Sequence, residues 1–98
     1  MIFQNNPSTL SQLAQMFKLL GDPTKMRIVH LLQGSPCKVG EITKTLGMTP
    51  SAISHQLRIL KDAAIVKSQK NGRMVTYSLS DDHVRKIIEI GLLHMSHE

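Results

Sequence analysis

Residues 39–63 read VGEITKTLGMTPSAISHQLRILKDA, and this stretch decides the fold. Its first part, 39–46, has the apolar spacing of a short helix, and Gly47 is a residue type that commonly ends one. Thr49-Pro50 then begins a second helix, which we expect to run to about Ala63. Two helices joined by a three-residue turn that contains glycine predict a helix-turn-helix.

Downstream of these helices the apolar pattern changes from helical to alternating. Residues 65–70 and 74–79 have the period of half-buried strands, and Asn71-Gly72 between them is a common hairpin turn. A hairpin directly after a helix-turn-helix is a wing. We therefore expect a mainly α (α+β) winged helix-turn-helix fold, with about five helices and a two-stranded wing in one domain, 1–98.

Three further helices complete this expectation. They are 8–20, capped by Ser8; 23–32, capped by Asp22; and a last helix that begins at Asp81 or Asp82 and runs to about His97. The last helix is apolar nearly all round, and such a helix is usually buried. We expect the domain to dimerise through its terminal helices, because 98 residues allow only a modest core.

The composition gives an expected compartment. Cys37 is the single cysteine, so no internal disulfide can form. Residues 1–7 lack the basic start and apolar run of a signal peptide, and no stretch is long enough to cross a membrane. We therefore expect a cytoplasmic protein without a membrane partner.

The formal net charge is +5, and its distribution is uneven. Residues 25–73 hold nine basic and two acidic side chains, whereas residues 74–98 hold two basic and four acidic ones. A nucleic-acid surface in the middle and a cation site near the end would produce this pattern, and so would chance.

The second helix of the helix-turn-helix has two distinct sides. Its expected inward positions are Ile53, Leu57, Leu60 and Ala64. The small polar and cationic side chains on another face are Ser51, Ser54, His55 and Arg58. Such side chains near a helix N-terminus can reach base edges in a major groove. The alternative is a solvated helix face, with His55 hydrogen-bonded inside the domain.

The wing favours the DNA interpretation. Lys67, Lys70 and Arg73 flank its tip, where long cations can contact phosphates or the minor groove. A charged hairpin is usually only a solubility feature. A charged hairpin directly after a helix-turn-helix much more often contacts DNA.

The last segment holds three of the five histidines, His83, His94 and His97, and it begins with Asp81. The three histidines share one stripe of a helix, at about 100° per residue. However, eleven residues separate His83 from His94, which is roughly 16 Å along the axis. Since a metal needs its ligands at about 2 Å, one helix cannot close a site from all four residues.

A second copy of the helix, antiparallel across a two-fold axis, would close two equal sites. Asp81 and His83 of one chain would meet His94 and His97 of the other. Three imidazoles and one carboxylate suit tetrahedral zinc or cobalt(II), and nickel if more ligands join. The apolar positions Ile87 and Ile90, with Gly91, lie between the ligands and support such pairing. The alternative is that histidines near a chain end have no function or remain from a purification tag.

Four stretches match a known pattern: Leu20–Ile28 (LGDPTKMRI), Ser51–Leu57 (SAISHQL), Gly72-Arg73 with Tyr77–Leu79, and Asp81-x-His83 with His94-x-x-His97. Along nearly its whole length the chain resembles the ArsR/SmtB family of bacterial metal-sensing repressors. The ending resembles the zinc- and cobalt-responsive branch, whose site lies on the last helix.

The resemblance implies a homodimeric repressor that binds an inverted-repeat DNA operator and releases it when Zn(II) or Co(II) binds, derepressing metal efflux or homeostasis genes. It also implies that Ser51, Ser54 and His55 read DNA. The full DNA-binding set that we expect is Ser51, Ser54, His55, Gln56, Arg58, Lys67, Lys70 and Arg73.

Branches of the family that use thiols carry a Cys-x-Cys pair where Lys38 and Gly40 stand here. Cys37 has no partner at that place, so we expect a packing role for it, although a second site with Cys37 or His30 stays open.

Three other functions place different demands on the sequence. A repressor of the same fold that senses a non-metal signal is the nearest alternative. A zinc enzyme would need an open coordination position and a general base, so we expect no enzyme and no small-molecule substrate. A metal buffer would not explain the basic centre and the wing.

Overall fold

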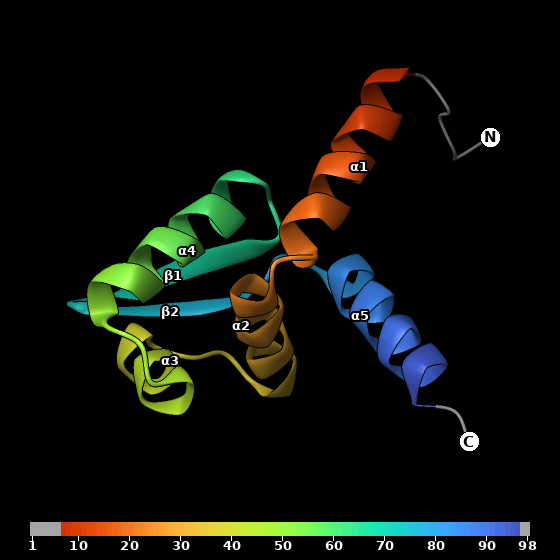
Figure 1. Ribbon diagram of the computed structural model, residues 1–98. Helices are drawn as coiled ribbons and strands as arrows, with labels where there is room; N and C mark the ends of the chain where they lie inside the picture. Colours follow the sequence, from red (N-terminus) through yellow and green to blue (C-terminus); the bar gives the residue numbers. More distant parts are fainter. Residues whose placement is uncertain (1–6, 97–98) are drawn as a thin grey trace.

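The computed structural model describes residues 7–96, which form five helices and one antiparallel hairpin (Figure 1). In chain order the elements are α1 (Pro7–Leu20), α2 (Pro23–Gly34), α3 (Val39–Leu46), α4 (Pro50–Asp62), β1 (Val66–Asn71), β2 (Met74–Leu79) and α5 (Asp82–Met95). This architecture confirms the winged helix-turn-helix. The helices α1 and α5 project from the side opposite the wing tip.

Local side-chain chemistry sets the helix ends. Asp22, Thr49 and Asp81 each accept the backbone N–H three residues ahead, at 3.0 or 3.1 Å. Each bond satisfies an amide that the first turn of a helix leaves without a partner. Gly47 ends α3 with a φ of 70°, a left-handed conformation that glycine adopts without strain.

One aliphatic core joins every element. No charged or polar residue in 7–96 is classed as buried. The buried residues are Leu20, Ile28, Val29, Leu32, Cys37, Ile42, Ile53, Leu57, Leu60, Ile65, Val66, Leu79, Val84 and Ile88. Because α4 contributes three of them, its opposite face is held toward solvent.

The hairpin register differs from the expected turn. Pairing runs from Val66 opposite Leu79 to Asn71 opposite Met74, so the turn is Gly72-Arg73 and not Asn71-Gly72. Gly72 has a φ of 62° and Arg73 has no positive φ, which is the type II′ pattern with glycine at the first central position. The predicted hairpin is confirmed, but Asn71 belongs to the last pair of the ladder and not to the turn.

Four expected boundaries are corrected. α1 already includes Ser8, which therefore is not its cap. α2 continues two residues past the expected end, to Gly34, and β1 begins one residue late, at Val66. α5 ends at Met95, and His97 lies outside the described residues.

One expectation about burial is also corrected. Ala64 is exposed, because α4 ends at Asp62 and Ala64 adopts a φ of 59°. In α5 only Val84 and Ile88 are buried within the single chain, although most of the helix is apolar. None of the helices described in 7–96 is long and apolar enough to cross a membrane.

Candidate functional site

The outward face of α4 carries the side chains expected to read DNA. Ser51, Ser54, His55 and Arg58 are all exposed, and the buried residues of α4 lie on the other side of the helix. The N-terminal end of α4 lies at the surface, and because Thr49 accepts the N–H groups of Ala52 and Ile53, the N–H of Ser51 is the one that can receive a phosphate there. The face is therefore polar, cationic and accessible.

Gln56 differs from the other expected DNA-binding residues. It lies three residues after Ile53 and four before Leu60, so the helical period turns it toward the core. Its side chain is partly buried, and Oε1 is buried without a hydrogen-bond partner. A DNA contact through Gln56 remains a prediction that requires this side chain to turn outward.

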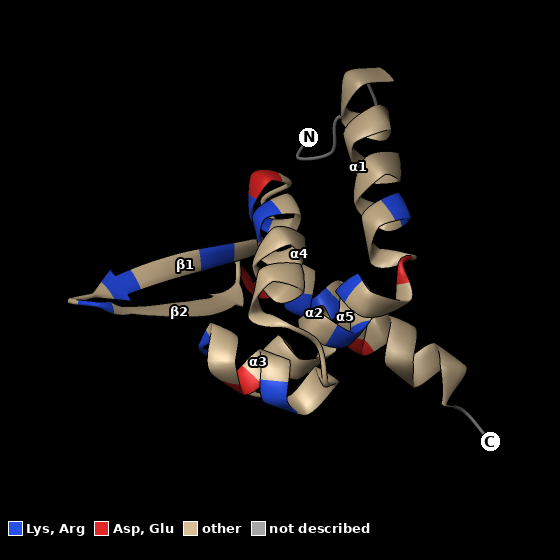
Figure 2. Cartoon of the chain, turned by 60° about the vertical axis from the view of Figure 1, so that its left-hand side comes forward, with Lys and Arg blue, Asp and Glu red and all other residues tan. Residues whose placement is uncertain are grey.

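The wing carries cations and no carboxylate. Lys67, Lys70 and Arg73 are exposed, and Figure 2 shows basic residues along β1 and at the start of β2. Strand pleating places Lys70 on the same face of β1 as the buried Val66, whereas Lys67 lies on the opposite face. Lys70 pairs with Val75, one position from the end of the ladder, and Arg73 lies in the turn, so these two are the cations close to the tip.

Two of the expected metal ligands lie together at the start of α5. His83 Nδ1 is 3.6 Å from Asp81 Oδ2, and the His83 side chain is 90% exposed. The other oxygen of Asp81, Oδ1, accepts the N–H of Val84. This N–H lowers the pKa of Asp81, and the nearby His83 lowers it further. A carboxylate and an imidazole, two donor types that can bind zinc, thus face solvent side by side.

The other expected ligands are not part of this cluster. His94 lies in the last turn of α5, and eleven residues of continuous helix separate it from His83, roughly 16 Å. Within 7–96 no three potential ligands gather at one place. His97 belongs to the residues that are not described. Within one chain, Asp81 and His83 thus lie at one end of α5 and His94 at the other.

Cys37 packs in the interior. Its side chain is 5% exposed, and Sγ lies 3.4 Å from the carbonyl oxygen of Ser35. Burial raises the pKa of the thiol, and the carboxylate of Glu41 raises it further. Cys37 also pairs through its backbone with Tyr77 of β2, which ties the loop before α3 to the wing. The structure thus places Cys37 where the packing role expects it.

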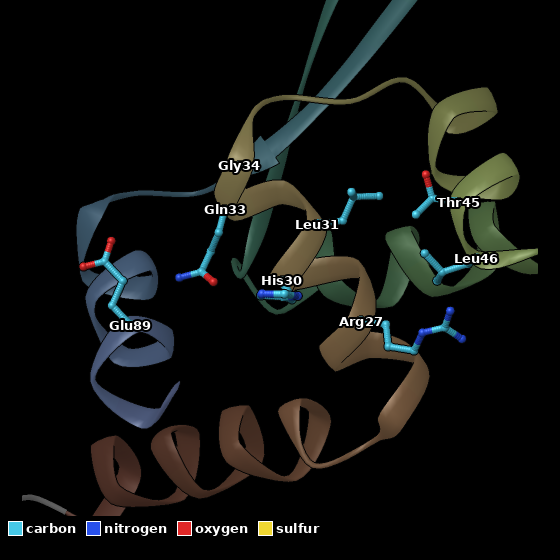
Figure 3. Close-up of a pocket in the computed structure, with 8 residues that line it drawn as sticks. All are labelled: Arg27, His30, Leu31, Gln33, Gly34, Thr45, Leu46 and Glu89. Atoms are coloured by element: carbon cyan, nitrogen blue, oxygen red, sulfur yellow. The ribbon is translucent and has the colours of Figure 1, made fainter. Parts of the chain in front are cut away.

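Two features have no counterpart in the sequence analysis. A cleft of about 620 Å³ opens between α2, α3 and α5 (Figure 3). Its lining residues are Arg27, His30, Leu31, Gln33, Gly34, Thr45, Leu46 and Glu89. Beside it, Arg85 of α5 and Gln33 of α2 exchange two hydrogen bonds. These contacts join residues 52 positions apart, so no local pattern indicates them.

Comparison with known proteins identifies the family. Residues 22–68 match the family described as bacterial regulatory protein, arsR family. The transcriptional regulator NmtR of Mycobacterium tuberculosis is 33% identical over 87 residues, covering 89% of this chain and 72% of NmtR. The chain belongs to the ArsR family. Like its relatives, this ArsR-family member is a DNA-binding transcriptional regulator, and the family members are not enzymes.

Further similarities support the assignment of this ArsR-family regulator. A homologue of the cadmium resistance regulatory protein CadC from Staphylococcus aureus is 37% identical over 83 residues, covering 83% of this chain and 68% of that protein. The solution structure of apo-NmtR superimposes with a TM-score of 0.83 at 30% identity, over 100% of this chain and 82% of that one. A Mycobacterium bovis domain described as homodimeric shares the fold, with a TM-score of 0.87 at 23% identity over 100% of this chain and 96% of that one.

Proposed function

We propose that this ArsR-family regulator is a homodimeric, cytoplasmic repressor that releases its operator when Zn(II) or Co(II) binds at α5. The observation that carries the proposal is the half-site at the start of α5, where His83 lies 3.6 Å from Asp81, with His94 at the opposite end of the same helix. The genes that it controls would serve metal efflux or homeostasis. The S. aureus relative, whose name refers to cadmium resistance, supports a metal signal.

The exposed apolar surface supports a dimer. The large exposed apolar side chains of the two projecting helices are Leu10, Leu13, Phe17, Ile90, Leu92, Leu93 and Met95. Between α1, α2 and α5 lies an almost wholly apolar groove of about 290 Å³. Monomeric proteins rarely expose a contiguous apolar surface of this kind. A second copy of the chain would bury it.

Antiparallel pairing of α5 with its copy would complete the metal site. Ile90 is 67% exposed, and nothing lies within 4 Å of the position that a Cβ of Gly91 would take. This open surface permits close approach of two helices. Asp81 and His83 of one protomer with His94 and His97 of its partner would hold the ion, which supplies a fixed charge between the two helices. Nickel would need additional ligands.

The DNA partner follows from the symmetry of the dimer. Two α4 helices related by a two-fold axis match two half-sites of an inverted repeat in successive major grooves. The exposed residues of α4 would read the bases, and the wing cations would contact the backbone. A metal-linked pair of α5 helices that fits this spacing poorly would release the DNA.

The test is DNA affinity with and without zinc. A duplex selected from a random pool by the metal-free protein serves as the probe, at one fixed salt concentration. We expect zinc to weaken binding by about 100-fold in the wild type, which is within the usual range of allosteric coupling. His94→Ala should abolish the effect, and His30→Ala, a histidine outside the proposed site, should preserve it. Equal affinity with and without zinc in the wild type would contradict the proposal.

A repressor of the same fold with a non-metal signal is the second candidate. The cleft between α2, α3 and α5 favours it, because Arg27, Gln33 and Glu89 add polar groups to a mainly apolar lining beside the helix-turn-helix. In that case zinc would leave DNA affinity unchanged, and His94→Ala would have no effect on induction.

A further inference from the structure

α5 is attached to the rest of the chain mainly near its first turns. Val84 and Ile88 are its buried residues, whereas Ile90, Leu92 and Leu93 are exposed. Figure 1 shows α5 extending away from α2 and the helix-turn-helix. Any displacement of α5 must therefore reach the DNA-reading helices through a small number of contacts near its N-terminal half.

The most specific of these contacts is reciprocal. Arg85 Nη1 donates to the carbonyl oxygen of Gln33 at 2.5 Å, and Gln33 Nε2 donates to the carbonyl oxygen of Arg85 at 3.3 Å. Gln33 lies in the last turn of α2, whose carbonyls have no partner within the helix. A guanidinium there satisfies one of them and complements the negative end of the helix dipole. The pair thus has a physical reason to stay formed.

α2 leads directly to the helix-turn-helix. Only residues 35–38 separate its end from α3, and Cys37 in that loop is paired with Tyr77 of the wing. In Figure 3 the side chain of Gln33 extends from α2 toward α5, while Thr45 and Leu46 of α3 lie on the other side of α2. This cleft separates α5 from α3. α5 is joined to β2 through residues 80–81, and the contact of Arg85 with Gln33 gives it a second connection, through the end of α2, to the helix-turn-helix.

We propose that Arg85 and Gln33 are positioning residues that transmit a displacement of α5 through the end of α2 to the helix-turn-helix. The inference rests on the proposed function, in which metal acts at α5. Arg85 and Gln33 contact neither the metal nor the DNA in this account. They determine how strongly metal binding at α5 changes the affinity for DNA.

The test compares Arg85→Ala and Gln33→Ala with the wild type, and uses Lys86→Ala as a control that removes an exposed charge from the next position of α5. Three quantities are measured for each protein: zinc stoichiometry, the ratio of DNA affinities without and with zinc, and the backbone amide NMR shifts that zinc causes in α2 and α3. The selected duplex described above is the DNA probe.

In the wild type and in Lys86→Ala, zinc should shift amides of α2 and α3 and weaken DNA binding about 100-fold. In Arg85→Ala the same amount of zinc should bind, but the shifts should remain in α5, and the ratio should fall below about 10-fold. Arg85→Lys keeps a donor and should restore part of the ratio. The double variant should lose little more than Arg85→Ala alone, since the two residues act together.

Gln33→Ala removes the side-chain donor to Arg85 but keeps the backbone carbonyl that accepts from the guanidinium, so its effect should be smaller, and it tests the inference even if Arg85→Ala fails to fold. If folded, zinc-bound Arg85→Ala and Gln33→Ala both keep the wild-type ratio of DNA affinities without and with zinc, the inference is wrong and the proposed function still stands. A wild-type protein that binds no zinc would overturn both.

Discussion

Asp81 uses its two carboxylate oxygens for different purposes. Oδ1 caps α5 by accepting the N–H of Val84, and Oδ2 lies 3.6 Å from His83 Nδ1. The cap fixes the orientation of the carboxylate at the helix start. A metal ligand that is already oriented needs little ordering when the ion binds. The residue thus connects the folding of α5 with the proposed site.

The cap makes the stability of the protein depend on Asp81 at acid pH. The pKa of Asp81 is lowered in the folded chain, so its carboxylate contributes stability above about pH 4, and this contribution is lost as the pH falls through the lowered pKa. Asp81→Asn keeps a good cap without a titrating group. Urea midpoints at pH 7 and pH 3 should therefore differ less in Asp81→Asn than in the wild type. An unchanged difference, or an equal effect of Asp82→Asn, would contradict this reading.

Ala64 is the one residue other than glycine in 7–96 with a positive φ, 59°. A left-handed conformation costs a residue with a Cβ roughly 1–2 kcal/mol. Ala64→Gly should therefore raise the free energy of unfolding by about 0.5–1 kcal/mol, after the greater chain entropy of glycine is subtracted. Ala63→Gly, at a φ of −90°, is the matched control and should lower it. Chemical denaturation of both variants measures the difference, and a destabilised Ala64→Gly would show that the backbone there is not strained.

At the scale of elements, α4 and the wing present different kinds of side chain to solvent. The α4 face presents hydroxyls, an imidazole and one guanidinium, whereas the wing presents long cations. Base edges carry sequence information and phosphates do not. Substitutions on α4 should therefore change sequence preference, and substitutions on the wing should change mainly the salt dependence.

The wing prediction distinguishes its two strand faces. Lys70→Ala and Arg73→Ala should each lower the slope of log K against log salt by about 1, the effect of one lost phosphate contact. Lys67→Ala should have a smaller effect, because Lys67 lies on the other face of β1 and farther from the tip. Anisotropy titrations of the selected duplex between low and moderate salt provide the slopes. If all three variants keep the wild-type slope, the DNA does not contact this part of the wing.

Local sequence signals predicted most of the elements. Gly47 and Thr49 fixed the ends of α3 and the start of α4, because caps and left-handed glycines depend on neighbouring residues only. The turn register was missed, since the ladder that includes Asn71 forms by pairing and not by turn propensity. The hydrogen bond between Arg85 and Gln33 could not be predicted from the sequence, because it depends on where α5 packs after the chain has folded. The proximity of Asp81 and His83 was predictable from their positions at the helix start, whereas a metal site that includes them remains a prediction, since it needs a second chain.

At the scale of the whole molecule, the apolar faces of α1 and α5 need a partner. Ile90→Glu would place a carboxylate in the proposed interface, where an uncompensated charge costs several kcal/mol. The dimer dissociation constant should rise by about 100-fold or more, and DNA affinity should fall with it. Met74→Glu, at an exposed apolar position on the wing, should leave the dimer intact. Sedimentation velocity over a range of concentrations measures both variants. A dimeric Ile90→Glu would show that α5 is not the interface.

The central claim, a metal site shared between two α5 helices, is tested most directly by mixing two inactive variants. His83→Ala and His94→Ala homodimers are each titrated with cobalt(II) and followed by visible absorption, alone and after subunit exchange. Neither variant alone should give the intense bands of tetrahedral cobalt. After exchange, each heterodimer should regain one intact site of two, so a statistical mixture should bind about a quarter of a cobalt ion per chain. If the mixture shows no tetrahedral cobalt while the wild type binds one ion per chain, the two ends of α5 do not share a site across the dimer, and the account is wrong.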